Sequence, residues 1–467
     1  MKKRRWLAAG MAAVMVAGLL AGCGSSSDSG DSAGDTAETT TAAAVQAPTE
    51  EASGEEVTLR VALWDYSNTQ YYKTMFDAFM AEYPNITIEP VEFTADEYDN
   101  VIVTQLSGKQ NFDVVFTKGT PALSALIAQG HILALDDLLA ADPDFDPSVY
   151  SGLVDELKLN GSTYALPFRY DNNLLFYNKD LFDAAGVEYP KDGMTMAEFH
   201  DLAAQLTSGE GNDKVYGAHV HTWASNVYQF PRRTEEYNML DPNTYDALIP
   251  YYNEIVAMQD EGLVQDYGAL KSSNIHYSGV FYNQQCAMMQ MGTWFINMLL
   301  ENVSDFNWGV CTLPNDIGML GENSVGGVTP VSIGAYGEHP AEAWQFIKYI
   351  CGEEGAKVLA STGIIPGYAS DAIAEIYNSF PETYPNAPEN LADYIICDKN
   401  VVEVNLNEHG KELDTITTEQ HSAIMTKSVT VEEGVQQLKE RAAEVLGVEL
   451  GAADAADTAE ETTAAAE

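Results

Sequence analysis

Basic residues are scarce in this chain. Its 467 residues include 23 lysines and arginines against 70 aspartates and glutamates, for a formal net charge of −47. Four of the cations lie in Met1–Arg5, so the remainder of the chain is more acidic still. A surface of this charge repels nucleic acid and anionic lipid, which argues against either as a partner. We expect the charge mainly to maintain solubility.

Long hydrophobic runs are also rare. Only the segment from about Trp6 to Ala21 is strongly apolar, and it follows the cations of Met1–Arg5. This pattern is typical of a secretory signal peptide and is too short for a stable membrane span. Since no other stretch reaches about 18 uninterrupted apolar residues, we predict no transmembrane helix.

The end of the signal, Leu20-Ala21-Gly22-Cys23, resembles the bacterial lipobox. The resemblance implies cleavage before Cys23, whose thiol then receives a diacylglycerol. Two acyl chains hold a protein at a membrane stably, where one would be marginal. The alternative is a plain secreted protein with an incidental cysteine.

Cysteines are few, and none forms a C-x-x-C pair. Four remain beside Cys23, far apart and among apolar neighbours: Cys286, Cys311, Cys351 and Cys397. Export permits disulfides, but the spacing specifies no pairing. We expect buried free thiols, with disulfides as the open alternative.

Sequence motifs typical of catalysis or of nucleotide binding are missing. The chain has no nucleophile elbow, HExxH or Ser-x-x-Lys word in a fitting context. The glycine-rich stretch Gly326–Pro330 lacks the lysine and hydroxyl residue of a P-loop. His219 and His221 lie two apart, but no third metal ligand is near in sequence, so ordinary polar histidines are favoured over a metal site. We predict neither enzyme activity nor a cofactor nor a metal.

The two ends of the chain are poor in apolar side chains. Gly24–Glu56 consists largely of Ser, Thr, Ala, Gly, Asp and Glu, which predicts a disordered tether. The stretch from Gly451 to Glu467 has a similar composition and reads as an acidic tail. Between them, Val57–Leu450 is longer than one hydrophobic core usually organises, which favours two lobes.

Strand and helix patterns alternate after residue 57. Val57–Leu63, Ile86–Phe93 and Asp113–Phe116 read as strands, with helical spacing in the segments between them. This βαβα order predicts a mainly parallel sheet with ligands at the carboxyl ends of its strands. The loops at those ends are Trp64–Asn68 and Thr117–Thr120.

The stretch Tyr164–Gly186 has the pattern of a strand followed by a short helix. Arg169, Asp171 and Asn173 stand two apart and lead into the apolar run Leu174–Tyr177, which suits a strand buried on both faces. Asn178 can cap a short helix that Gly186 closes. Alone, the pattern also fits an edge strand with a local Arg169–Asp171 ion pair.

Sequence motifs in this stretch, and one later in the chain, resemble those of a known protein family. Tyr164-x-Leu166-Pro167 is followed by Tyr177-Asn178-Lys179-Asp180-Leu181-Phe182, and Ala287-Met288-x-x-x-Gly292-x-Trp294 occurs later. These words resemble the extracellular solute-binding proteins of ABC importers, family 1, which includes maltose- and oligosaccharide-binding proteins. The resemblance implies an α/β, two-lobed periplasmic-binding-protein-like fold, each lobe a mainly parallel sheet flanked by helices. Three hinge crossovers are then expected near Pro167, Pro314 and Pro366.

The expected organisation follows from these readings. It comprises a signal peptide (1–22), a lipidated cysteine and tether (23–56), a first lobe (57–168 plus 315–366), a second lobe (169–314 plus 367–450) and an acidic tail (451–467).

The candidate ligand contacts combine loop position with the resemblance. Trp64 could instead cover the core, and Lys118 could be an ordinary solvated charge. Asp171 lies four residues past the crossover proline, where the resemblance implies an acidic sugar contact. The full candidate set is Trp64, Tyr66, Asn68, Thr117, Lys118, Arg169, Asp171, Trp223, Gly292, Trp294, Gly327 and Thr329.

The resemblance implies a monomeric, lipid-anchored binding subunit that captures a sugar at the extracellular or periplasmic side, and we expect that sugar to be an oligosaccharide. Its partners would be the sugar and the transmembrane subunits of an ABC permease. Alternatives are a binding protein for a non-sugar solute such as a polyamine, an extracellular glycosidase, and an adhesin or chaperone on the same fold.

Overall fold

The computed structural model describes residues 44–49, 52–94, 97–273, 275–314, 323–397 and 399–451. The predicted signal peptide, Cys23, most of the tether and the tail after Gly451 lie outside these residues. Among the described residues, no helix has both the length and the apolar character needed to cross a membrane.

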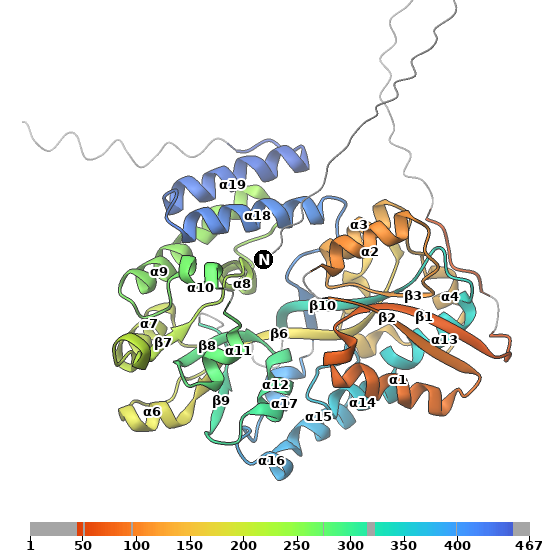
Figure 1. Cartoon of the computed structure of the whole chain (residues 1–467). Helices are drawn as coiled ribbons and strands as arrows, with labels where there is room; N and C mark the ends of the chain where they lie inside the picture. The colour runs from red at the N-terminus through yellow and green to blue at the C-terminus, as the bar shows by residue number, and fades with distance from the viewer. Residues whose placement is uncertain are drawn as a thin grey trace, which may run out of the picture. The chain divides into compact units, whose positions relative to one another are not determined.

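The first lobe is built around three parallel strands. β1 (Val57–Trp64) lies between β2 (Ile86–Phe93) and β3 (Val114–Phe116). α2 (Tyr98–Ser107) and α3 (Thr120–Ala128) lie on one side of this sheet, and α1 (Gln70–Glu82) and α13 (Pro340–Cys351) on the other (Figure 1). The predicted alternation of strands and helices is confirmed.

One long strand, β6 (Leu166–Asn178), belongs to both lobes (Figure 1). Its first half pairs with β10 (Asn323–Ile333), and its second half pairs with β8 (Cys286–Gly292) and β9 (Trp308–Cys311). The partner changes between Asn172 and Asn173. The predicted lobe boundaries remain a prediction. The change of partner lies close to the predicted boundary between residues 168 and 169.

The sheet is mixed, which departs in detail from the mainly parallel arrangement we expected. β10 is antiparallel to β3 and to β6, and β6 is antiparallel to β8 and β9. Strands joined through helical crossovers run parallel. β6 and β10 instead carry the chain between the lobes in opposite directions, so they pair antiparallel.

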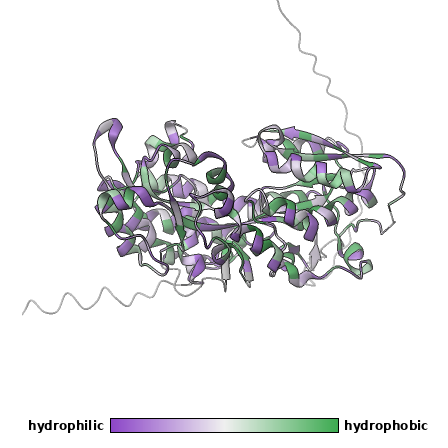
Figure 2. Cartoon of the chain, turned by 90° about the horizontal axis from the view of Figure 1, so that it is seen from below, coloured by the Kyte–Doolittle hydropathy of each residue, from purple (hydrophilic) through white to green (hydrophobic). Residues whose placement is uncertain are grey.

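The second lobe has a hydrophobic cluster on each face of its sheet. Along β6, Leu175 and Tyr177 belong to one cluster, and Leu174 and Phe176 to the other. This alternation confirms the predicted strand buried on both faces. β7 (Tyr216–His219) runs parallel to β8. Figure 2 shows that the helices carry both hydrophobic and hydrophilic residues along their length.

The remaining elements complete the two lobes. They are η1 (Tyr66–Asn68), α4 (Asp136–Ala141), η2 (Pro147–Tyr150), α5 (Leu153–Glu156), β4 (Lys158–Leu159), β5 (Ser162–Thr163), α6 (Lys179–Ala185), α7 (Met196–Leu206), η3 (Gly211–Asp213), α8 (Ser225–Arg233), η4 (Pro242–Leu248), α9 (Ile249–Asp260), α10 (Tyr267–Ser273), α11 (Tyr277–Tyr282), α12 (Trp294–Asn302), α14 (Glu353–Ala360), α15 (Asp371–Asn378), α16 (Phe380–Thr383), α17 (Ala392–Ile395), β11 (Lys399–Val402), α18 (Gly410–Met425) and α19 (Val431–Leu446).

The two predicted caps of α6 are present. The Asn178 side chain accepts a hydrogen bond from the Leu181 N–H at the start of α6, and Gly186 ends that helix with φ 69°. Capping boxes open α7 at Thr195 and α19 at Thr430. Each such cap satisfies backbone N–H groups that the first turn of a helix leaves unpaired.

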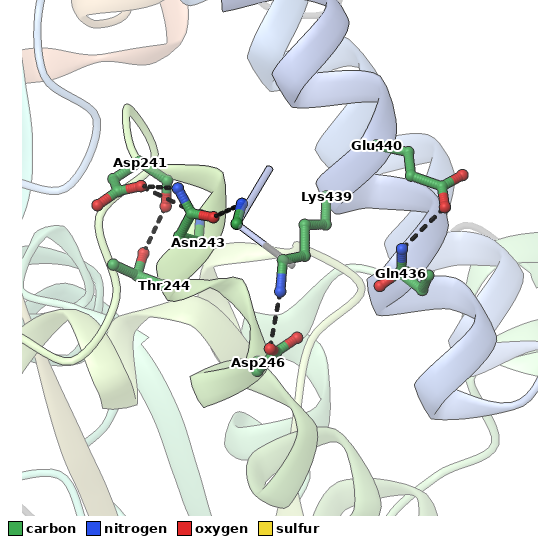
Figure 3. A network of polar contacts seen from close by, with 8 residues as sticks. Asp241, Asn243, Thr244, Asp246, Gln436, Lys439 and Glu440 are labelled. Carbon is green, nitrogen blue, oxygen red and sulfur yellow. Dashed lines mark hydrogen bonds and ion pairs between the residues drawn. The ribbon is translucent and has the colours of Figure 1, made fainter. Parts of the chain in front are cut away.

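The final helix, α19, packs back onto the second lobe. Its apolar residues Val435 and Leu438 enter the second-lobe cluster. A polar contact joins the helix to η4, where Lys439 Nζ lies 2.8 Å from Asp246 Oδ2 (Figure 3). Just beyond the helix, the Gly451 N–H donates to Asn243 Oδ1 at 3.0 Å.

Part of the predicted tether lies against the first lobe. The Ala47 N–H donates to the Ala134 carbonyl at 2.8 Å, and the Ala47 side chain is only 2% exposed. Gln46 donates to Asp136 Oδ2 at 3.0 Å. Ser53 donates to Glu342 Oε1 through both its N–H and its hydroxyl at 2.9 Å. Composition did not indicate this docking because it depends on one small side chain and on pairing with a distant partner.

Candidate ligand-binding site

The polar row on β6 lies on one face of the sheet. Alternate residues of a strand point the same way, so Arg169, Asp171 and Asn173 share a face. Their partners in register on the neighbouring strands are Thr329, Gly327 and Gly292, respectively. Residues paired in register point to the same face, so six residues from three distant parts of the sequence meet here. Five of them are in the candidate set.

Arg169 is held by three neighbours. Its Nε donates to Thr329 Oγ1 at 2.9 Å, and its Nη1 donates to the Tyr71 hydroxyl at 3.0 Å. Nε also lies 3.6 Å from Asp171 Oδ2, which makes an ion pair. These contacts come from α1, β6 and β10, so the guanidinium is fixed by both the first-lobe helix and the crossing strands.

Asp171 is a buried carboxylate with an incomplete set of partners. The residue is 5% exposed, and within the described part of the chain its Oδ1 has no hydrogen-bond donor. Burial raises the pKa of the Asp171 carboxyl, and the Arg169 charge partly opposes that rise. A buried acceptor without a donor costs free energy, and a ligand hydroxyl would supply the missing hydrogen bond.

An aromatic group flanks this row. The Trp294 indole lies over Gly292, because a Cβ on that glycine would be only 1.8 Å from the ring. The Trp294 Nε1–H donates to the Tyr277 hydroxyl at 3.0 Å. Trp223, which is 37% exposed, meets Trp294 and Tyr277 edge-on with ring centroids 5.9 and 5.6 Å apart. Gly292 is therefore required at its position by the indole that covers it.

His221 belongs to the same aromatic group. Its ring centroid lies 4.5 Å from that of Trp223, and its Nδ1 lies 3.3 Å from His219 Nε2. Burial lowers the pKa of His219 to about 4 and that of His221 to about 3. Both imidazoles are therefore neutral at physiological pH and act as polar, uncharged groups.

Two first-lobe candidates, Trp64 and Lys118, lie next to each other. Trp64 packs against Tyr98 with centroids 5.1 Å apart, and Lys118 Nζ lies 5.7 Å from the Trp64 ring. Trp64 is linked to Arg169 through Tyr72 and Tyr71. Trp64 is half-buried and packs against the first-lobe core, and its role as a ligand contact stays a prediction.

The other first-lobe candidates have mainly structural surroundings. Tyr66 stacks on Phe76 at 5.6 Å. Thr117 is fully buried, and its N–H donates to the Pro330 carbonyl at 2.9 Å, which joins β3 to β10. Asn68 lies in η1, and its side chain is outside the described residues. Their role as ligand contacts stays a prediction.

Three residues near the polar row were not among the candidates. Tyr71 lies in the segment with helical spacing between the predicted strands Val57–Leu63 and Ile86–Phe93. Tyr277 carried no local signal, since its contacts with Trp223 and Trp294 are made only in the folded chain. Glu403 accepts a hydrogen bond from Gln229 Nε2 at 2.6 Å. It interrupts an apolar run, Val401-Val402-Glu403-Val404, and that charge was a signal we did not use.

Two cavities lie elsewhere in the described residues. One of about 680 Å³ is lined by Tyr177, Cys311 and Tyr394, and one of about 630 Å³ by Trp344 and Tyr349 of α13 among others. None of the candidate residues lines either cavity. We place more weight on the polar row than on these cavities, because the row combines a buried unpaired acceptor with exposed aromatic surface.

The fold and this site define a solute-binding protein with two lobes. The chain belongs to the family of bacterial extracellular solute-binding proteins, whose profile matches residues 66–357, more than half of the sequence. The expected family and fold class are confirmed. The members of this family are binding proteins.

Similar proteins agree with this assignment. A sugar transporter from Rhizobium etli, solved in an open conformation, is 34% identical, covers 83% of this chain and 99% of its own, and superposes with a TM-score of 0.71. An ABC substrate-binding protein from Listeria monocytogenes in complex with cycloalternan shares the fold at 19% identity and a TM-score of 0.71, over 85% of this chain and 100% of its own. A lactose-binding protein of Rhizobium radiobacter is 22% identical over 428 residues, 86% of this chain and 96% of its own.

Proposed function

We propose that this protein is the lipid-anchored binding subunit of an ABC importer, which captures a neutral carbohydrate and delivers it to a membrane permease. The observation that carries the proposal is the Arg169–Asp171 pair beside the rings of Trp294, Tyr277 and Trp223. Sugar transport or lactose binding by the similar proteins supports the same ligand class.

The chemistry of the row suits a sugar. A carbohydrate has hydroxyl groups at its edges and apolar C–H groups on its faces. The Asp171 carboxylate can accept from hydroxyl groups, and aromatic rings can cover the C–H faces. Arg169 balances the charge of Asp171, so a neutral ligand leaves no net charge buried at this pair.

The position of the row suits capture by closure. β6 pairs with first-lobe strands up to Asn172 and with second-lobe strands from Asn173 onward. A ligand at Asp171 would be close to both lobes and would make its full contacts only when they close. Such a ligand selects the closed state by its differential affinity.

A ligand screen by thermal shift tests the proposal. The probes are lactose, mannobiose and D-mannitol as neutral polyols, with spermidine and sn-glycerol 3-phosphate as charged comparators. A probe at a hundred times its dissociation constant adds about 2.7 kcal/mol to the free energy of unfolding. A shift with a neutral sugar is the expected result, and a shift with spermidine or the phosphate ester alone would overturn the carbohydrate assignment.

Two further assays test the remaining parts of the proposal. Bound sugar should be recovered intact, so release of reducing ends during incubation would show a glycosidase instead. Cys23→Ser should release the protein from membranes of the native host, and a variant that stays wholly membrane-bound would contradict the lipid anchor.

A further inference from the structure

Three neighbouring strands place Asp171, Gly327 and Glu403 in one row across the sheet. Gly327 pairs with Asp171 of β6 in antiparallel register. On its other side, Gly326 pairs with Val402 of β11 in parallel register, and the Glu403 N–H donates to the Gly326 carbonyl at 2.8 Å. Glu403 therefore follows β11 directly and lies beside Gly327.

The register places Asp171 and Glu403 on the same face of the sheet, on either side of Gly327. Neighbouring strands are about 4.8 Å apart, so two strand spacings separate the Cα atoms of Asp171 and Glu403 by about 10 Å. The middle residue has no side chain. A Cβ built on Gly327 would have one neighbouring atom within 4 Å, Glu403 Oε1 at 3.9 Å. We name the space over Gly327, between the carboxyl groups of Asp171 and Glu403, the Gly327 slot.

Two of the three residues that define the slot, Gly327 and Glu403, are partly exposed to solvent. Gly327 is half-buried, whereas Val325, Gly326 and every residue from Val328 to Ile333 are buried. Glu403 is likewise half-buried. Within this part of β10, the partly exposed position is therefore the glycine.

Hydrogen-bond acceptors surround the slot. Within the described residues, Asp171 Oδ1 is buried without a donor, and so is Gln229 Oε1. The other end of the Gln229 amide donates to Glu403 Oε2, which leaves Glu403 Oε1 as the atom over Gly327. Burial, with Asp171 and Asp414 nearby, raises the pKa of the Glu403 carboxyl to about 7 despite the Gln229 hydrogen bond and the Arg233 charge.

We propose that the Gly327 slot is a ligand subsite for a pair of hydrogen-bond donors, with Glu403 as a second ligand carboxylate opposite Asp171. The inference rests on the proposed function and specifies which part of the solute enters. Two neighbouring hydroxyl groups of a sugar ring can each donate to one carboxylate. An amine has the same donor chemistry, whereas a phosphate or carboxylate is repelled by both groups.

The backbone at Gly327 allows a direct test of the slot. Gly327 has no left-handed φ, and an added methyl group would make only an ordinary contact with Glu403. Gly327→Ala should therefore fold normally and fill the slot. Gly279→Ala in α11 is the matched control, because a Cβ there meets nothing within 4 Å and its φ is also ordinary. Glu403→Gln removes the charge and keeps the side-chain size.

Affinities are measured by calorimetry with lactose, mannobiose, D-mannitol and spermidine for the wild type and the three variants. For the probe that binds the wild type, Gly327→Ala should weaken binding at least tenfold, Glu403→Gln severalfold, and Gly279→Ala not at all. The apo melting temperatures of the first two variants should stay close to that of the wild type. If Gly327→Ala melts much earlier, Glu403→Gln provides the deciding comparison.

The outcomes separate the subsite from the proposed function. Wild-type affinity in both Gly327→Ala and Glu403→Gln overturns the subsite and leaves sugar binding intact. Binding of spermidine alone, weakened by both variants, supports the donor subsite and overturns the sugar proposal. Binding of no probe at millimolar concentration counts against both.

Discussion

The indole N–H of Trp294 donates to the hydroxyl of Tyr277 at 3.0 Å, and the same indole covers Gly292. Trp294 is half-buried and packs against hydrophobic clusters of both lobes. It therefore combines a packing role with the ligand role that we predict for it.

Trp294→Ala should show both roles. We expect a loss of about 2 kcal/mol in the free energy of unfolding, less than the 3–5 kcal/mol of a fully buried tryptophan. We also expect a loss of binding free energy for the sugar that exceeds this loss of stability. The fluorescence quenching induced by the ligand should be lost as well. Tyr277→Phe serves as the comparison, since removing one hydrogen bond costs about 1 kcal/mol. A Trp294→Ala protein that melts early but binds with normal affinity would place this residue in the core alone.

Asp171→Asn should weaken ligand binding more than it weakens folding. The carboxylate becomes a neutral acceptor of nearly the same shape, and burial already disfavours its charge. We expect at least a tenfold rise in the dissociation constant by calorimetry, with an apo stability within about 1 kcal/mol of the wild type. Thr329→Val, which removes the other partner of Arg169 Nε, is the control for disturbance of the arginine. Unchanged affinity would remove Asp171 from the site.

His200 should make the second lobe sensitive to pH. Its Nδ1 lies 2.6 Å from Glu254 Oε1, and its Nε2 lies 3.1 Å from Glu261 Oε2. Burial alone would lower the pKa of His200, but the two carboxylates outweigh it and raise the pKa above 6.5. Because the folded pKa is raised, the stabilisation is complete below about pH 6.5 and is lost as the pH rises through the folded pKa.

Melting temperatures of wild type and His200→Gln between about pH 5 and pH 9 would check this sign. The difference should be largest at the acidic end and should disappear at the alkaline end. A difference that grows with pH would contradict the assignment.

Arg233 should contribute strongly to the stability of the crossing strands. Its Nη2 donates to Asn172 Oδ1 and to the Asn173 carbonyl, both at 2.9 Å, and reaches the Val325 carbonyl at 3.3 Å. Arg233→Met leaves these buried acceptors without a donor and should cost about 3 kcal/mol. The adjacent Arg232 is more exposed and makes longer contacts, so Arg232→Met should cost less than half as much by denaturant unfolding. Equal costs would argue that the position in α8 matters and the acceptors do not.

Closure of the two lobes on a ligand should reduce the radius of gyration of the protein. If the lobes close about the strands that cross near Asn172, small-angle scattering should give a smaller radius of gyration with saturating sugar than without it. Asp171→Asn at the same sugar concentration should keep the larger radius. An unchanged radius in the wild type at saturation would contradict hinge closure.

The polar row on β6 could be predicted from the sequence because its pattern is local. Arg169 and Asp171 follow the two-residue period of a strand, and Thr329 and Gly327 lie in a glycine-rich run that the family resemblance brought to the same place. The Asn178 cap of α6 could be predicted for the same reason, since Asn178 and Leu181 are only three residues apart.

The remainder depended on contacts between distant segments. Tyr277 and Glu403 join the site through pairings that no local pattern encodes. The direction of β10 was not readable either, because periodicity reports which face a residue takes and not which neighbour its strand will find. Ala47 shows the same limit in a segment whose composition resembles a tether.

The reactivity of the buried cysteines can report the unfolding of the parts of the chain in which they lie. Cys351, Cys311 and Cys286 belong to three different hydrophobic clusters, one in the first lobe and two on opposite faces of the second-lobe sheet. All three are free thiols, and burial raises the pKa of each, so the reactive thiolate is scarce in the folded state. An alkylating reagent added during slow heating would mark each thiol as its surroundings open. Peptide mass spectrometry could then time the melting of each cluster separately, with no label introduced into the protein.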